Sequence, residues 1–165
     1  MKEYEFRSVC DRYSVLISEK NLVKMKSECT SSCTNETGGI LIGYYSSNLS
    51  KAIITHVTTP TYDSKKNRNS FLRGVIGLKN RLEYYWNIKS EFYIGEWHFH
   101  PVASPKPSQI DIDQMKMLSK NRELNCPEPI LIILGQNSEN IWTVSASVFV
   151  DNIVINLVNN KIDLM

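Results

Sequence analysis

Two histidines separated by one residue, His98 and His100, are the side chains whose types and spacing best fit metal chemistry. In a strand over residues 91–99, side chains alternate between the two faces. Both imidazoles then point the same way, whereas Trp97 and Phe99 point to the opposite face, into a core. The side chains on one face of this strand are therefore predicted to take part in chemistry, and those on the other face to pack in the core.

Three prolines in residues 101–107 end this strand and prevent a helix there. A helical pattern begins at Ser108, and Asp111 lies in its first turn. Strand, loop and helix start can thus bring two imidazoles and one carboxylate together. Catalytic zinc takes three such ligands and leaves a position for water, whose pKa it lowers to about 7. This chemistry still needs a general base and an oxyanion stabiliser.

The spacing His-x-His, seven residues, Ser, two residues, Asp resembles the signature of the JAB/MPN (JAMM) metallopeptidases. Here it reads His98, His100, Ser108 and Asp111, and Glu36, followed by Thr-Gly-Gly-Ile-Leu-Ile-Gly, resembles the family's upstream glutamate. The wording Gly-Glu-Trp-His-x-His-Pro is most similar to the prokaryotic JAB branch. The resemblance covers roughly residues 10–150.

The resemblance implies one Zn²⁺ per chain, held by His98, His100 and Asp111. It implies that Glu36 takes a proton from water and delivers it to the leaving amine, while Ser108 stabilises the oxyanion. The implied substrate is an amide at the C-terminus of a ubiquitin-like or otherwise conjugated protein with an extended tail. Similar prokaryotic proteins accompany ubiquitin-activating and conjugating enzyme homologues, and in anti-phage CBASS systems such a peptidase removes a conjugated nucleotidyltransferase.

Other side chains compete for these roles. Strand parity places Glu96 on the face of His98, where it could serve as base, as fourth ligand, or as a partner that orients a histidine. The resemblance favours Glu36 as base and leaves Glu96 as an orienting or ion-paired residue. Asp113 lies about 200° around the helix from Asp111 and faces elsewhere. The third histidine, His56, is interpreted as a hydrogen-bonded strand residue.

Ser108 also fits a purely structural role, because Ser-x-x-Asp is close to a helix capping box. Its hydroxyl cannot cap the helix and donate to an oxyanion at the same moment. The sequence leaves both roles open.

Length and composition suit one domain over residues 1–165 with a substantial core. The net charge of +2 is too small to indicate nucleic-acid binding. The charged N-terminus has no signal-peptide pattern, and no apolar run could span a bilayer, so a cytoplasmic location is expected. The four cysteines are expected to be reduced thiols. Cys29 and Cys33 are not interpreted as a metal site, because no second pair accompanies them.

The periodicity predicts an α+β fold, an α/β sandwich. The resemblance makes this a JAB/MPN-like curved mixed β-sheet flanked by two long helices and one shorter N-terminal helix. Helices are expected over about 19–29 and 108–122, with a third after a Ser70 cap. Strands are predicted at 3–9, 13–18, 38–45, 51–58, 91–99, 130–134, 141–150 and 153–158.

Residues 59–86, between the strands predicted at 51–58 and 91–99, carry two further predictions. Residues 59–70 are hydrophilic and are predicted to form a loop, which in JAB enzymes helps hold the substrate tail. Its basic residues, Lys65, Lys66 and Arg68, could attract an acidic partner. The apolar residues that follow recur at helical spacing and predict one helical stripe packed against the core: Phe71, Val75, Leu78, Leu82, Tyr85 and Trp86.

Three other functions remain as alternatives. A sulfur-carrier-protein tail peptidase would use the same site. A non-catalytic MPN-type scaffold would have lost ligands, whereas all five motif residues are present here. A DNA-repair-associated JAB relative is disfavoured by the weak net charge and the Gly-Glu-Trp-His wording.

Overall fold

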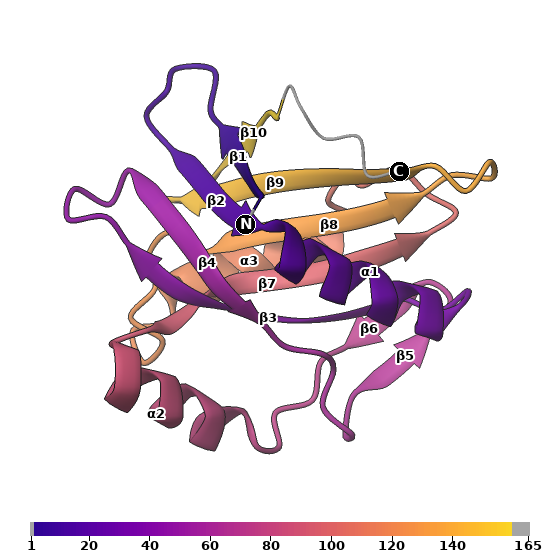
Figure 1. Cartoon of the computed structure of the whole chain (residues 1–165), viewed down its shortest axis with the longest axis horizontal. Helices are drawn as coiled ribbons and strands as arrows, with labels where there is room; N and C mark the ends of the chain where they lie inside the picture. The colour runs from indigo at the N-terminus through magenta and orange to yellow at the C-terminus, as the bar shows by residue number, and fades with distance from the viewer. Residues whose placement is uncertain (1, 160–165) are drawn as a thin grey trace.

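The computed structural model describes residues 2–159, and its strands form one curved, mixed eight-stranded sheet in the order β1-β2-β4-β3-β7-β8-β9-β10 (Figure 1). Pairs β2–β4 and β7–β8 are parallel, and the other neighbours are antiparallel. The strands of the sheet are β1 (Glu3–Arg7), β2 (Ser14–Ser18), β3 (Thr37–Tyr45), β4 (Lys51–Val57), β7 (Phe92–Pro101), β8 (Ile130–Gln136), β9 (Trp142–Val150) and β10 (Ile153–Leu157).

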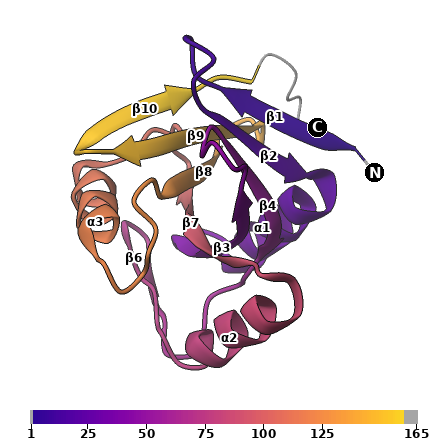
Figure 2. The same cartoon turned by 90° about the vertical axis from the view of Figure 1, so that its left-hand side faces the viewer.

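Three helices cover the sheet: α1 (Glu19–Ser32), α2 (Leu78–Lys89) and α3 (Gln109–Lys120). Helix α1 buries Leu22, Met25 and Cys29 in a core shared with strands from both ends of the sheet. The other face of the sheet packs against α2 through Leu78 and against α3 through Met115. In Figure 2, β6 runs between α2 and α3. This α+β architecture confirms the predicted fold class, although α1, at 14 residues, is longer than the 12-residue α2 and α3.

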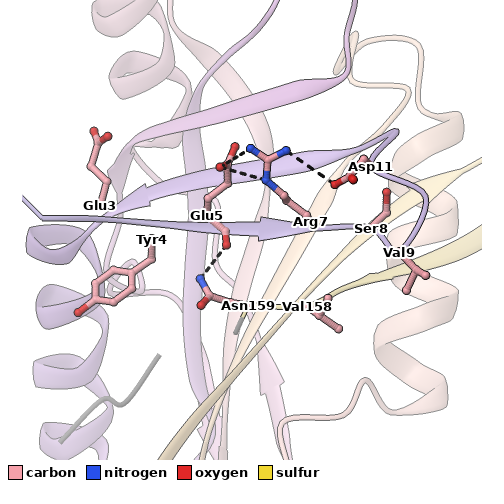
Figure 3. Close-up of a pocket in the computed structure, with 9 residues that line it drawn as sticks. All are labelled: Glu3, Tyr4, Glu5, Arg7, Ser8, Val9, Asp11, Val158 and Asn159. Atoms are coloured by element: carbon pink, nitrogen blue, oxygen red, sulfur yellow. Dashed lines mark hydrogen bonds and ion pairs between the residues drawn. The ribbon is translucent and has the colours of Figure 1, made fainter. Parts of the chain in front are cut away.

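The sheet curls until its two outer strands meet. The backbone N–H of Arg7 donates to the Val158 carbonyl at 2.9 Å, and the Val158 N–H donates back at 2.8 Å. Figure 3 shows this seam, where the Asn159 side-chain amide also donates to the Glu5 carbonyl at 2.7 Å. The eight strands thus close into a barrel-like curve around the α1 core.

The segment before α2 differs from the prediction. Residues 59–70 are not all loop, since β5 (Lys65–Asn67) pairs with β6 (Ser70–Leu72) in a short antiparallel hairpin. Ser70 and Phe71 lie in β6, and α2 starts only after Gly77, whose φ of +82° is outside the helical region. The Asp63 carboxylate accepts the Val75 N–H at 2.9 Å, which holds that residue outside the helix.

The predicted apolar stripe is therefore wrong as a single packed face. Val75 is 65% exposed and Trp86 is 57% exposed, and the α2 side chains in the core are the buried Leu78 with the half-buried Leu82 and Tyr85. Helical spacing alone did not reveal that the first residues of the stripe belong to another element.

In the part of the chain that the structure describes, no helix is long and apolar enough to cross a membrane. The four cysteines are free thiols, as expected, with Cys10 and Cys33 exposed and Cys29 and Cys126 buried.

Candidate active site

The central strand β7 carries His98 and His100 on one face, and Trp97 and Phe99 on the other. Trp97 and Phe99 are 0% and 1% exposed and belong to the α1 core, as the alternation predicts. The Trp97 indole N–H donates to the Thr58 carbonyl at 2.8 Å, so its polar atom is satisfied inside that core. Packing on one face thus fixes the direction in which the imidazoles point on the other.

Helix α3 brings Asp111 to the two histidines. Its carboxylate Oδ1 lies 2.8 Å from Nδ1 of His98, and Oδ2 lies 3.4 Å from Nε2 of His100. One possible ligand atom from each of the three residues lies within 4.8 Å of the other two. His98 and Asp111 are buried, and His100 is half-buried. The three side chains predicted as ligands therefore form one cluster.

The register of β3 on β7 places Glu36 beside this cluster. Gly38 pairs with His98 and Thr37 with Phe99, so Glu36, which precedes β3, lies next to the ligand-bearing end of β7. A Cβ at Gly38 would lie 2.9 Å from the Phe71 ring and 3.0 Å from the His98 ring, so glycine lets these rings approach β3. Glu36 faces the same cavity as His98, His100 and Asp111.

Ser108 caps α3 and holds Asp111. Its hydroxyl donates to Asp111 Oδ2 at 2.6 Å and accepts the Asp111 N–H at 3.2 Å, while its own N–H donates to Oδ2 at 2.8 Å. This is the predicted capping box, and Ser108 also lines the cavity. The structure therefore shows the cap, and it places Ser108 at the wall of the cavity.

Glu96 occupies a fully buried position beside His98. Its Oε1 accepts from Arg73 Nε at 3.0 Å and Nη2 at 2.9 Å, and its Oε2 accepts from Gln114 Nε2 at 3.2 Å. Oε2 also lies 3.6 Å from Nε2 of His98. Glu96 is thus a buried residue ion-paired with Arg73, one of the two roles that the sequence left to it. The sequence did not predict Arg73 as a partner, because it fell within the predicted helix after Ser70, nor Gln114, because its contact with Glu96 spans two elements.

His56 and Asp113 stand apart from the cluster, as expected. His56 Nδ1 contacts the Thr55 carbonyl at 2.8 Å, and its ring packs on Tyr85 with 4.2 Å between centroids. Asp113 is exposed and accepts from Gln109 at 2.9 Å. Cys33 is exposed, and neither its side chain nor that of His56 lines the cavity.

The electrostatics of the cluster favour a bound cation. Burial acts to lower the pKa of His98, but contacts with Asp111 and Glu96 outweigh it and raise that pKa to about 9. Burial acts to raise the pKa of Asp111, but contacts with His100 and His98 hold it well below its ordinary value. Protonated His98 thus supplies a positive charge between two carboxylates, and a dication would displace that proton.

The pKa of the Glu36 carboxyl shifts in the direction opposite to that of Asp111. Burial raises the pKa of its carboxyl, with a further increase from the Asp111 charge, whereas His100 and His98 act to lower it. A raised pKa suits a carboxylate that must accept and then release a proton.

The cavity at this cluster has a volume of about 460 Å³. Its walls come from the turn of the β5–β6 hairpin, the proline loop after β7, and the first turns of α3. A cavity of about 560 Å³ lies at the seam of Figure 3. We place the active site in the smaller one, because the ligand cluster and Glu36 open onto it.

The donor set fits zinc, since two imidazoles and a carboxylate are the ligand types of catalytic zinc sites. Nε2 of His98 is also buried without a hydrogen-bond partner among the described residues. An unsatisfied buried nitrogen is costly unless something binds it.

Comparison with known proteins gives a consistent result. The profile of the family described as prokaryotic homologs of the JAB domain matches residues 18–145. The chain is 43% identical to a protein of Enterobacter hormaechei subsp. hoffmannii named CD-NTase/cGAS isopeptidase, over 90% of this chain and 82% of that protein. An Escherichia coli protein with the same name is 31% identical over 86% of this chain and 87% of its own.

A solved structure supports the fold alone. The solution structure of a protein from Desulfitobacterium hafniense superposes with a TM-score of 0.56 at 15% identity, covering 84% of this chain and 86% of that one.

Proposed function

The chain belongs to the prokaryotic JAB family and is a metallopeptidase of that family, and from this premise we propose that it is a zinc-dependent isopeptidase that releases a conjugated CD-NTase or cGAS-like protein. The observation that carries the proposal is the cluster of His98, His100 and Asp111 opening with Glu36 onto one cavity. The names of the relatives supply the substrate class. We further propose that residues 1–165 act as one domain in the cytoplasm.

Under this proposal, His98, His100 and Asp111 hold one zinc ion. Bound zinc supplies Lewis-acid activation of a water and of the scissile carbonyl. Glu36 accepts the proton of the attacking water and delivers it to the leaving amine, for which its raised pKa is suited. Ser108 turns its hydroxyl from Asp111 towards the oxyanion, and the Glu96 carboxylate, paired with Arg73, keeps a buried negative charge beside the His98 ring.

We propose that the cavity receives an extended protein tail. The β5–β6 hairpin and the proline loop form two walls with the ligand cluster between them. A C-terminal segment lying between these walls presents its amide to Glu36 without unfolding of the conjugated protein.

The test separates metal binding from chemistry. Wild type, His98→Ala and Glu36→Gln are loaded with zinc, desalted and analysed for metal. We expect about one zinc per chain in wild type and Glu36→Gln, and none in folded His98→Ala. Glu36→Gln should lose about 100- to 10,000-fold in kcat on a CD-NTase amide conjugate, measured by mass spectrometry of the released protein.

A folded wild-type protein that retains no zinc would contradict the hydrolase and favour a non-catalytic scaffold. Zinc binding with cleavage of a sulfur-carrier tail but not of a CD-NTase conjugate would replace the substrate and keep the mechanism.

A further inference from the structure

Two basic side chains, Arg68 and Lys106, line the catalytic cavity on two different walls. Arg68 lies in the turn of the β5–β6 hairpin, and Lys106 lies in the proline loop between β7 and α3. Both are exposed at the mouth of the cavity. Neither side chain has a hydrogen bond or ion pair with any residue in the range 2–159 that the structure describes.

Two other basic residues near the cavity, Lys66 and Arg73, are paired with carboxylates. Lys66, in the same hairpin as Arg68, donates to Glu28 at 2.6 Å, and Arg73 is paired with the buried Glu96. The sequence alone grouped Lys65, Lys66 and Arg68 as one basic segment. The structure separates them, because only Arg68 of the three lines the cavity.

The charges inside the cavity leave these two cations in excess. With zinc bound and both histidines neutral, the two positive charges of the metal balance the carboxylates of Glu36 and Asp111. Arg73 balances Glu96. Arg68 and Lys106 therefore remain as uncompensated positive charge where a substrate tail must enter.

We infer that the cavity selects amide substrates that carry an acidic side chain beside the scissile bond, and that Arg68 and Lys106 bind that carboxylate. The inference rests on the proposed function and specifies the substrate of the same site. The planar guanidinium of Arg68 can form paired hydrogen bonds to a carboxylate, whereas the Lys106 ammonium supplies a mobile point charge. A positively charged cleft mouth also raises the local concentration of acidic segments.

The test measures binding without turnover, in full-length zinc-loaded Glu36→Gln protein. Two short fluorescent peptide pools are compared by anisotropy. One has Asp or Glu fixed beside a central amide, and the other has Asn or Gln at the same place. We expect the acidic pool to bind about fivefold more tightly or better, as charge-assisted contacts at a partly exposed site allow. Added salt should reduce the difference, because exposed charges are screened.

Matched variants assign the effect to the two side chains. Adding Arg68→Met and Lys106→Met to the Glu36→Gln protein should abolish the preference. Adding Lys65→Met, which removes a charge from an exposed side chain of the same hairpin outside the cavity, should preserve it. Zinc content, measured in every variant, should not change.

Equal affinity for the two pools, or a preference that survives the loss of both cations, overturns the inference; the second result would mean that zinc itself binds the acidic group. Wild-type cleavage of conjugates without any acidic preference would overturn this inference and leave the proposed function standing. If the acidic pool binds more tightly but the zinc-loaded wild type cleaves no conjugate, the proposed isopeptidase function is contradicted. The preference of the cavity for acidic peptides is then still supported.

Discussion

The Asp111 carboxylate has two structural roles. It completes the capping box of α3 with Ser108, and it contacts both histidines of the cluster. The hydrogen bonds that start the helix therefore also fix the side-chain orientation of Asp111. A change at the helix start would alter the cluster of His98, His100 and Asp111 directly.

Ser108→Ala tests whether the cap and the chemistry share one hydroxyl. We expect the free energy of unfolding to fall by about 1 kcal/mol, as for other lost N-caps, and kcat to fall by about 100-fold at unchanged zinc content. Chemical denaturation and steady-state kinetics measure the two effects.

Ser18→Ala is the matched control. Ser18 caps α1 by accepting the Asn21 N–H at 3.3 Å and lies outside the catalytic cavity. It should show a comparable stability loss and a normal kcat. A Ser108→Ala enzyme with normal kcat would restrict Ser108 to the cap.

His56 gives a pH dependence that is separate from the metal ligands. Burial lowers its pKa, an effect opposed by Glu91, which lies 3.5 Å away, and reinforced by Lys89, Lys24 and Lys20. The folded state therefore binds its proton less readily than the unfolded chain does. Its contribution to stability is complete above about pH 6.5 and is lost as pH falls through the lowered pKa.

Thermal unfolding of wild type and His56→Asn between pH 7.5 and 5 measures this contribution. We expect the wild-type midpoint to decline more steeply than that of the variant. Parallel declines would show that other groups cause the acid sensitivity.

At the scale of elements, the β5–β6 hairpin is tied to both halves of the active site. Arg73, which follows β6, pairs with Glu96 beside His98, and the Asn67 carbonyl accepts the Glu36 N–H at 2.8 Å. Lys66 is tied to Glu28, whose Oε1 also accepts from Thr37 at 3.0 Å, next to Glu36. The hairpin therefore holds the turn that carries Glu36 and also forms a wall of the cavity.

Lys66→Met should loosen the turn that carries Glu36. We expect kcat to fall by about three- to tenfold, because small displacements of a catalytic group are costly, with unchanged zinc content. Lys79→Met is the control, since its pairing with Glu83 at 3.9 Å is exposed and distant in the fold. Equal kinetics for both variants would mean that the tie does not position Glu36.

Much of this arrangement follows from the sequence because it depends on local rules. Strand parity predicted the directions of His98 and Trp97, and the capping pattern predicted the start of α3. The hairpin did not follow, because its strands are three residues each and its position depends on distant partners. The predicted helix included Arg73, whereas α2 begins only after Gly77. The ion pair between Arg73 and Glu96 therefore could not be predicted from the helical pattern.

At the scale of the whole molecule, the closed curl makes β10 part of the core. Leu157 is 5% exposed and packs in the cluster that contains α1 and the inner face of β7. Leu157→Ala should reduce the free energy of unfolding by about 2–5 kcal/mol, the usual cost of a cavity in a packed core. Denaturant titration measures it.

Ile153→Ala, on the same strand at 63% exposure, should change stability by less than about 0.5 kcal/mol. Similar losses in the two variants would mean that the strand, rather than the buried side chain, carries the effect.

The closure of the sheet also determines when its first and last strands can pair during synthesis. The outer edge of β1 pairs at Arg7 with the backbone of Val158, which is 151 residues later (158 − 7). At ribosomal rates of about 5–20 residues per second, synthesis of the residues between β1 and Val158 takes on the order of ten seconds. During this time the outer edge of β1 has no backbone partner. Contacts this distant in sequence also form slowly. During the delay, β1 offers an unpaired edge to neighbouring nascent chains, so yield in the cell should depend on chaperones and synthesis rate more than on the stability of the finished fold.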